Sequence, residues 1–564
     1  MISKNIYKQT RYFINEIYRS KIIIQAILVG IIAGLLVVLF RVSIAKLFLF
    51  IQNSLNVYSF PVKAILFPLI TTLGGLISGI LVWKYAPETK GSGIPYVKMT
   101  LTRMGKLIRV RSIIVKFFAG VAGIGTGLSL GREGPSVQLG AGAGALIGKL
   151  FNMNGTDKDK LIAAGAGSAI AATFNAPIAG TIFILEELVQ KFSASLLFPA
   201  LIATVCADTL SRCLLGNKPC FIIPQSVNTI DSQSFFACVV LGIMAAIFGV
   251  LFAKTIFFNN KLFNKLQLPN YIKPAIAGLA VGIIGLFFPL ILGSGNIAVD
   301  VLLAHKLQIG IILTIFLLKF LLTPLCFGSG AAGGIFLPTL MLGAFLGYIV
   351  AGLLNIFGFH IDYVLLSVLG MGAFLSAVAR TPITATVMVF EMTGSYNFIL
   401  PIMLCCAIAD LIAEKLGHKP IYSMLIVNDS TKTGEAKLLS EINVKVAMNK
   451  NVEFVKLKDT LKNVKDKIAQ KQHSTYPVLN KNKKLCGYIT KSNIEDLIFQ
   501  GMPETLEVQK VMNPTPITVR EDENLYVTYY RLHSNNINCL FITDKLNTLK
   551  GIITREDILK HIKE

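Results

Sequence analysis

The sequence predicts a mostly α-helical, polytopic membrane protein made of two related halves, followed by a water-soluble α/β region. Composition supports the membrane part, because 53% of the residues are hydrophobic and only 15% are charged, whereas about a quarter of the residues in a soluble protein are charged. An internal repeat supports the two halves, and a sharp rise in charge density near residue 430 supports the soluble region.

The first membrane span is predicted at residues 22–40, which run 19 positions without a charge. A helix rises about 1.5 Å per residue, so this run can cross a hydrocarbon core of about 30 Å. It is too long for the apolar core of a cleavable signal peptide, and Arg41 and further apolar blocks follow it. The positive-inside rule places the N-terminal segment 1–21 in the cytoplasm, because a single acid, Glu16, is outnumbered there by five basic residues: Lys4, Lys8, Arg11, Arg19 and Lys21.

The charge density marks the boundary between the two regions. Charged side chains make up about 28% of residues 431–564 but only about 11% of residues 1–430. We therefore expect a membrane region over 22–426, a polar linker over 427–439 and a soluble region after it, long enough for its own core. The basic soluble region is expected in the cytoplasm too.

The net charge of +23 and the nine cysteines have ordinary explanations. Basic residues that flank membrane spans account for the charge, so we expect no nucleic-acid binding. The cysteines show no CxxC spacing and several lie in apolar runs. They are expected to be small buried hydrophobic residues rather than disulfides or a metal site.

The membrane region contains two homologous halves, at about residues 25–220 and 235–425. If each half crosses the bilayer an odd number of times, the second is inverted relative to the first, as in many transporters with a site at the midplane. Three anchor motifs recur at offsets of 202 to 205 residues. The pairs are 91–93 with 293–295, 131–141 with 334–344, and 177–186 with 382–391.

The anchors share one pattern, in which glycines and a proline precede a helical apolar run. Such helix starts inside a membrane leave free N–H groups that must face a cavity or a ligand, and the helix dipole favours an anion. Tight helix packing is the alternative role for the glycines, but it does not explain Glu133. A carboxylate at membrane depth can occupy the anion's place when charged and leave when protonated, so Glu133 is predicted to be a gate. Its neighbour Arg132 fits better as a buried structural charge.

Four stretches resemble the signature sequences of the CLC family of chloride channels and proton-coupled chloride exchangers: "GSGIP" (91–95), "GREGP" (131–135), "GGIFLP" (333–338) and "KPIYS" (419–423). They occur in the family's order across nearly the whole membrane region. The resemblance implies a homodimer with one pore in each subunit, and two inverted-topology helical repeats with broken helices.

The resemblance also implies an anion site. Ser92 and Tyr422 would supply hydroxyls to a central chloride, and the backbone amides of Ile335 and Phe336 would meet the same ion. Glu133 matches the external gating glutamate, whose carboxylate competes with chloride and carries the proton. Proline replaces the serine in the family's nitrate exchangers.

Other matched positions concern the electrostatics and the proton path. Lys116 sits where the family has a lysine that makes the pore electropositive, with a snorkelling lysine as the alternative. Glu187 matches the internal proton-accepting glutamate of many exchangers, which favours an exchanger over a passive chloride channel. Helix capping or a salt bridge is the alternative for Glu186 and Glu187. Tyr96 departs from the family, where an acidic residue commonly follows "GSGIP".

The soluble region repeats with a period of 64, because "GYITKSNIEDL" (487–497) pairs with "GIITREDILKH" (551–561). It resembles a tandem pair of CBS domains, at 440–500 and 501–564. Transport requires no cofactor, but such pairs often bind an adenine nucleotide, and Thr554 and Asp557 fit that pattern. The first unit has Asn493 in place of the carboxylate, so one site is plausible and two are not. A purely structural dimerisation module is the alternative.

Taken together, the residues predict anion transport across a membrane, with chloride/proton exchange favoured and a passive voltage- or pH-gated channel as the alternative. A CBS-containing divalent-cation transporter is more remote, since it would need clustered carboxylates at the midplane. The six histidines show no HExxH spacing, so no enzyme and no metal site are expected. The chain is expected to be a multi-pass protein of a bacterial inner membrane, surrounded by lipid, with both termini cytoplasmic.

Overall fold

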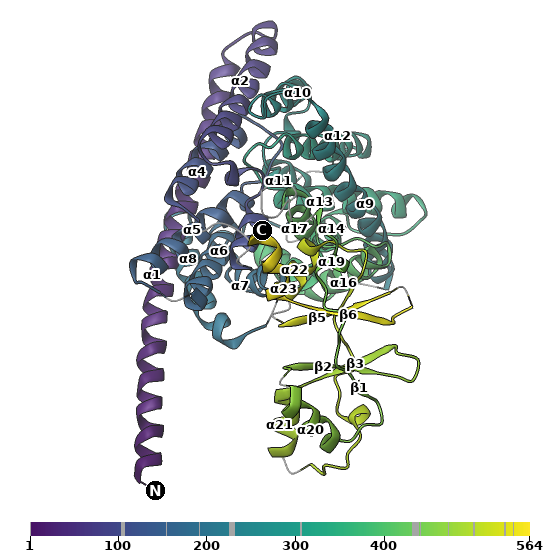
Figure 1. Cartoon of the computed structure of the whole chain (residues 1–564). Helices are drawn as coiled ribbons and strands as arrows, with labels where there is room; N and C mark the ends of the chain where they lie inside the picture. The colour runs from purple at the N-terminus through teal and green to yellow at the C-terminus, as the bar shows by residue number, and fades with distance from the viewer. Residues whose placement is uncertain are drawn as a thin grey trace. The chain divides into compact units, whose positions relative to one another are not determined.

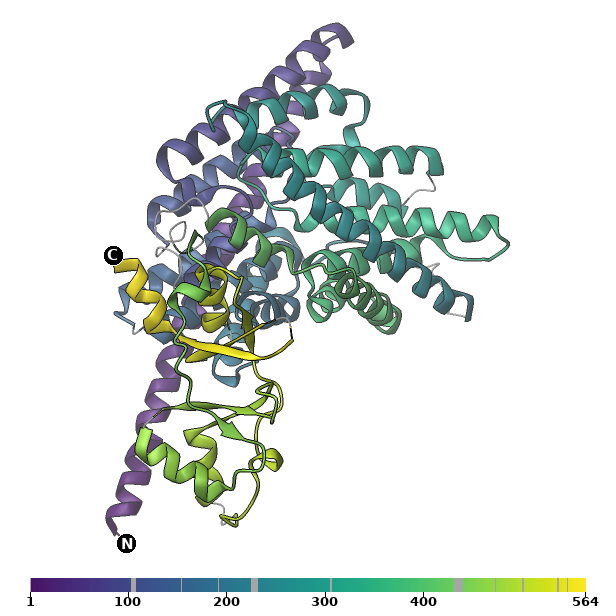
Figure 2. The ribbon, with the colours of Figure 1, turned by 45° about the vertical axis from the view of Figure 1, so that its right-hand side comes forward.

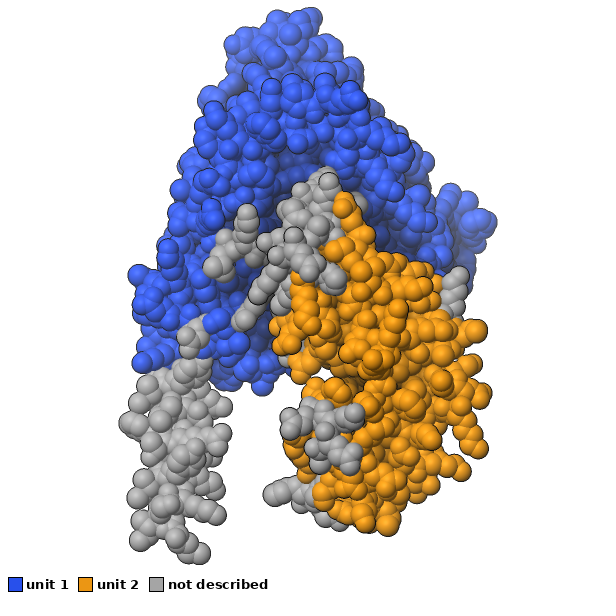
Figure 3. All heavy atoms as spheres, in the orientation of Figure 1, with its two compact units in different colours: residues 1–424 blue, residues 425–564 orange. Residues whose placement is uncertain are grey.

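The computed structural model divides into two compact units, residues 1–424 and residues 425–564 (Figure 3). Most of the predicted linker 427–439 lies outside the described residues. These comprise residues 2–102, 108–153, 155–190, 192–224, 232–304, 307–430, 439, 441–471, 473–499, 502–534, 537–544 and 546–563.

In its described residues, the first unit is a bundle of helices in which one series of eight is followed by a second series of eight. The next helix, α17 (Ile421–Ser430), begins in the first unit, whose last residue is Met424. The first series is α1 (Ile2–Asn56), α2 (Phe60–Ile80), α3 (Ile94–Leu101), α4 (Val110–Gly125), α5 (Glu133–Leu150), α6 (Gly155–Phe174), α7 (Pro177–Phe183) and α8 (Ala194–Leu215). The second is α9 (Ser232–Lys265), α10 (Lys273–Phe287), α11 (Asn296–Ala304), α12 (Ile309–Gly328), α13 (Phe336–Ile356), α14 (Tyr363–Ala379), α15 (Pro382–Thr393) and α16 (Ile399–Lys415).

Short turns interrupt both series, as expected for broken helices. Among them, the π-helical turn η3 (Ile184–Leu188) continues α7 and carries both Glu186 and Glu187. The others are η1 (Leu81–Tyr85), η2 (Pro87–Thr89), η4 (Pro289–Ile291) and η5 (Tyr396–Phe398). Seven of the described helices are long and apolar enough to cross a membrane, and Lys21–Asn56 contains the predicted span 22–40.

Glycines let corresponding helices approach closely in both halves, as the packing alternative predicted. Gly140 of α5 faces the backbone of Gly165 on α6, and Gly343 of α13 faces Gly370 on α14, with no space for a side chain in either place. The equivalent helices α2 and α10 also pack against each other and lie side by side in Figures 1 and 2.

The two halves make reciprocal contacts. The carboxylate of Glu186, in η3, accepts hydrogen bonds from the N–H groups at the start of α15, and Glu391 of α15 accepts hydrogen bonds from those at the start of α7. Gly131 and Gly334 exchange two backbone hydrogen bonds of 2.7 and 2.6 Å. Contacts that are exchanged in this way arise when a two-fold axis relates two similar parts.

The described part of the second unit contains two three-stranded sheets of identical topology. In each, a parallel pair is followed by an antiparallel pair, in the order β1-β2-β3 and β4-β5-β6. The strands are β1 (Val455–Lys456), β2 (Thr475–Leu479), β3 (Leu485–Thr490), β4 (Thr518–Arg520), β5 (Cys539–Thr543) and β6 (Leu549–Thr554). The accompanying helices are α19 (Val444–Ala447), α20 (Leu461–Lys471), α21 (Lys491–Phe499), η6 (Val508–Lys510), α22 (Leu525–Ser534) and α23 (Arg555–Lys563).

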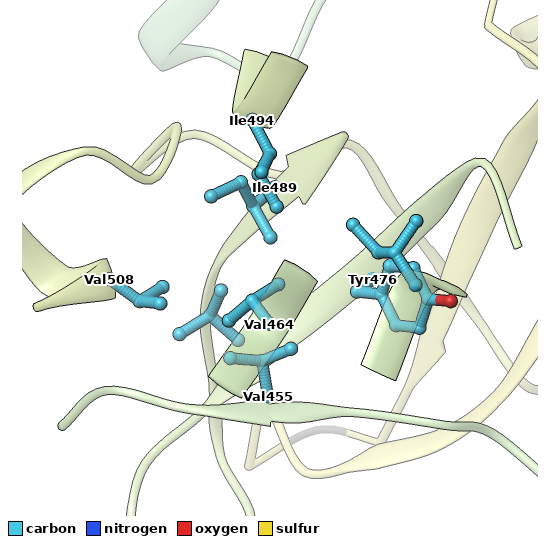
Figure 4. Close-up of a cluster of buried hydrophobic side chains, with 8 residues drawn as sticks. Val455, Val464, Tyr476, Ile489, Ile494 and Val508 are labelled. Carbon is cyan, nitrogen blue, oxygen red and sulfur yellow. The ribbon is translucent and has the colours of Figure 1, made fainter. Parts of the chain in front are cut away.

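The period of 64 is visible in the strand register. Thr475 pairs with Thr490 in the first sheet, and Cys539 pairs with Thr554 in the second, so both partners move by 64 positions. The first sheet has its own apolar core, in which Val455, Val464 and Ile489 pack with Tyr476 (Figure 4). The first repeat is therefore an α/β unit with a core of its own.

Candidate functional site

Backbone hydrogen bonds join the three signature loops of the membrane unit. Gly333 N–H donates to the carbonyl of Gly91 at 3.1 Å, and Gly91 N–H donates to Ala331 at 3.2 Å. Together with the Gly131–Gly334 pair, these bonds bring the starts of α3, α5 and α13 to one place. Gly91 and Gly93 have φ angles of +64° and +92°, which side chains rarely adopt, so the loop requires glycine on both sides of Ser92.

Ser92 is 2% exposed, and its hydroxyl has no hydrogen-bond partner among the described residues. A buried hydroxyl without a partner costs free energy, about 1–3 kcal/mol, so the position of the Ser92 hydroxyl suits a ligand.

Lys116 supports the Ser92 loop from α4. Its ammonium is fully buried and donates to the carbonyls of Thr89 and Gly91 at 2.8 and 2.6 Å, so it does not snorkel.

Glu133 is the first residue of α5 and is fully buried. Its Oε2 accepts a hydrogen bond of 3.4 Å from Leu337 N–H in the first turn of α13, while its Oε1 has no partner among the described residues. The carboxylate therefore occupies the N-terminal end of α13, where the helix dipole favours an anion.

Ile335 and Phe336 form the start of that same helix, Ile335 as the residue before it and Phe336 as its first residue. Both are 1% exposed, and the Phe336 ring packs against those of Phe174 and Phe183. Tyr422 lies in the first turn of α17 and is 1% exposed.

The two neighbouring glutamates of η3 have different partners. Glu186 caps α15 by accepting from Ile383 N–H at 3.1 Å and from Thr384 N–H at 2.6 Å, so helix capping is correct for this residue. Glu187 points elsewhere and is 1% exposed. Its Oε1 lies 2.8 Å from the ammonium of Lys98.

Sequence analysis missed Lys98 as a partner of this site. The available signal was a lysine in a short apolar helix, three positions after the "GSGIP" stretch. Sequence analysis also expected Arg132 to be buried, and this is wrong in part: Arg132 is partly exposed, although its Nε is buried. Arg132 lies just before α5, so its long side chain can extend beyond the helix end.

In the second unit, Thr554 ends β6 and Asp557 lies in the first turn of α23. The Asp557 Oδ2 accepts from the Thr554 N–H and hydroxyl at 2.9 and 2.7 Å, which is a side-chain cap of the helix start. Thr490 and Asn493 form the equivalent pair in the first repeat.

Comparisons with known families match both units. The model of the voltage gated chloride channel family matches residues 74–414, and the CBS domain model matches residues 439–499 and 508–564. The chain is 35% identical to the H(+)/Cl(-) exchange transporter ClcA of Vibrio parahaemolyticus serotype O3:K6, over 64% of this chain and 78% of that protein. It is 33% identical to the ClcA of Klebsiella pneumoniae, over 72% of this chain and 88% of that protein.

Two solved structures also match this chain. A slow cyanobacterial Cl-/H+ antiporter matches with a TM-score of 0.70 and 30% identity, over 73% of this chain and 98% of that one. A eukaryotic CLC transporter matches with a TM-score of 0.67 and 18% identity, over 96% of this chain and 98% of that one, which supports the fold. The predicted fold class, with two inverted-topology helical repeats and a tandem CBS pair, is confirmed. The chain is a membrane protein that belongs to the voltage gated chloride channel family and carries two CBS domains after its membrane unit.

Proposed function

We propose that this protein exchanges chloride for protons across the membrane. The observation that carries the proposal is the position of Glu133, whose buried carboxylate sits at the start of α13 with one oxygen unpartnered among the described residues. A helix start that accepts a carboxylate also suits chloride. Chloride and the Glu133 carboxylate therefore compete for one place, and a proton on Glu133 removes its charge and frees that place. The names of the relatives support the same exchange.

In this proposal, the central chloride is held by the hydroxyls of Ser92 and Tyr422 and by the N–H groups of Ile335 and Phe336. Lys116 holds the Ser92 loop and adds positive charge near the pore. The proton from the inner side reaches Glu133 by way of Glu187, because a second buried carboxylate is a better relay than water among apolar side chains.

The experiment is proton transport in liposomes that contain the purified protein. An outward chloride gradient, with the membrane potential clamped, should drive protons uphill, and an inward gradient should reverse their direction. A passive channel would move chloride in the same assay with no proton movement, and that result would refute the exchange.

We further propose that the protein is a homodimer in a bacterial inner membrane with both termini in the cytoplasm. The five basic residues before the first span support this orientation.

The CBS pair would bind one adenine nucleotide near Thr554 and Asp557. Calorimetric titration with ATP tests this, and Asp557→Ala should abolish the heat of binding.

A further inference from the structure

A buried ion pair lies at the inner glutamate. The ammonium of Lys98, on α3, is 2.8 Å from Glu187 Oε1 and 2.9 Å from the hydroxyl of Ser423, on α17. Both charged side chains of the pair are 1% exposed. Lys98 thus connects three elements that are distant in sequence: α3, η3 and α17.

Two other lysines of the membrane unit are equally buried but are held differently. Lys116 donates to the carbonyls of Thr89 and Gly91, and Lys319 donates to those of Ile291 and Gly293. Carbonyl partners do not titrate. Lys98 is paired with a carboxylate, so its surroundings change whenever that carboxylate gains or loses a proton.

The energetic consequence follows from burial. A buried carboxylate without a cation beside it keeps its proton rather than ionise, and a buried cation without an anion is similarly unfavourable. Glu186 on the same turn is an acid, and Tyr422 on α17 is neutral or an anion, so neither supplies a positive charge. Among the described residues, Lys98 is the cation paired with Glu187. Its charge favours release of the proton that Glu187 accepts.

We propose that Lys98 is a positioning residue for proton transfer, which holds Glu187 in place and compensates its charge. This inference rests on the proposed exchange. When a proton binds Glu187, the ion pair becomes a contact between a neutral acid and the ammonium, and Ser423 keeps the ammonium in place. When the proton leaves towards Glu133, the ion pair forms again. No other bond is made or broken.

The test compares the ratio of protons to chloride transported in liposomes. Lys98→Met should move chloride while the coupled proton flux falls about tenfold, since Glu187 then stays protonated. Lys98→Arg, which keeps the charge, should retain coupling within about twofold. Lys98→Gln keeps a hydrogen-bond donor but no charge, and should behave like Lys98→Met even if the methionine variant does not fold. Full coupling in Lys98→Gln would overturn the proposal.

Two further variants separate this role from a structural one. Lys319→Met removes an equally buried lysine without a carboxylate partner and should leave the proton-to-chloride ratio unchanged. In a Glu187→Gln background, Lys98→Met should not change the ratio further, because Lys98 acts through Glu187. If the wild type moves no protons uphill, the exchange itself is refuted. A different result would refute only the role of Lys98. In that case chloride and proton transport are coupled in the wild type and in Lys98→Gln, but not in Glu187→Gln.

Discussion

The glycine loops of the two membrane halves have the same backbone but different surroundings. Gly91 and Gly293 have φ angles of +64° and +59°, and Gly93 and Gly295 have φ angles of +92° and +96°. A fully buried lysine supports each loop from the following long helix, Lys116 in one half and Lys319 in the other. The sequence repeat therefore preserves both the shape of the loop and its support.

The serines at the centre of these loops differ. The Ser92 hydroxyl is buried and has no partner among the described residues, whereas the Ser294 hydroxyl donates to Asn296 Oδ1 at 3.0 Å. The helix starts differ as well, because Glu133 begins α5 while Phe336 occupies the equivalent first position of α13. The features that the two halves share belong to the scaffold, and the positions where they differ are those to which we assign roles in the proposed exchange.

The largest effect is expected at Glu133. Glu133→Gln keeps the shape but cannot ionise, so chloride should still move while uphill proton movement falls below detection. Proton and chloride fluxes in liposomes measure both. Glu133→Ala should give the same loss of coupling, and uphill proton pumping in either variant would contradict the gate assignment.

The next effect separates the two glutamates of η3. Glu187→Gln should lose proton coupling while chloride still passes, because the amide cannot titrate. Glu186→Gln should keep coupling but lower the thermal unfolding temperature, since it weakens the cap of α15, an effect of about 0.5–2 kcal/mol for caps in general. Undiminished coupling in Glu187→Gln would mean that protons enter by another route.

Anion preference should depend on only one of the two serines. Ser92→Pro removes the hydroxyl donor and should raise nitrate transport relative to chloride several-fold, as a lost hydrogen bond of about 1 kcal/mol implies. Ser294→Ala, at the equivalent position, should leave the preference unchanged. Competition between the two anions in flux assays measures the ratio, and an equal shift in both variants would place selectivity outside the Ser92 loop.

The supporting lysines should also differ in effect. Lys116→Met loses two charge-assisted hydrogen bonds, each worth about 1.5–3 kcal/mol, and should slow chloride transport about tenfold because the Ser92 loop is released. Lys319→Met should lower the unfolding temperature without slowing chloride transport to this extent. Matching losses of transport in the two variants would show that both loops contribute to the pore.

The smallest effect concerns the turns of the two CBS repeats. Asn480 and Asp544 are equivalent, and the Oδ1 of each accepts from two backbone N–H groups at 2.9 Å. The Thr548 N–H, with the Lys550 ammonium, holds the pKa of Asp544 below its usual value.

Because its pKa is lowered in the folded state, Asp544 should stabilise its turn above the usual pKa of an aspartate, and this contribution should be lost as the pH falls through the folded value. The β5–β6 turn should therefore lose protection against hydrogen exchange in acid, while the β2–β3 turn of the first repeat should not. Asp544→Asn should abolish this difference in the full-length protein. A difference that persists in that variant would assign it to another group.

Much of this protein could be predicted from local pattern. Apolar runs of membrane-spanning length, the repeats of 202 to 205 and of 64 residues, and glycines beside Ser92 each reflect short-range chemistry that is visible in the sequence. The family and the fold class followed from the same motifs and are confirmed, whereas the roles of Ser92, Glu133, Glu187, Ile335, Phe336 and Tyr422 stay predictions.

Only the tertiary structure decided which partners the two glutamates of η3 have. Glu186 and Glu187 are neighbours in sequence, yet one caps α15 and the other pairs with Lys98, 89 positions away. The π-helical turn and the packing of α3 and α17 around it determine this difference. A sequence motif specifies which groups a residue can bind, but the identity of a buried partner depends on which distant elements the fold brings within about 3 Å.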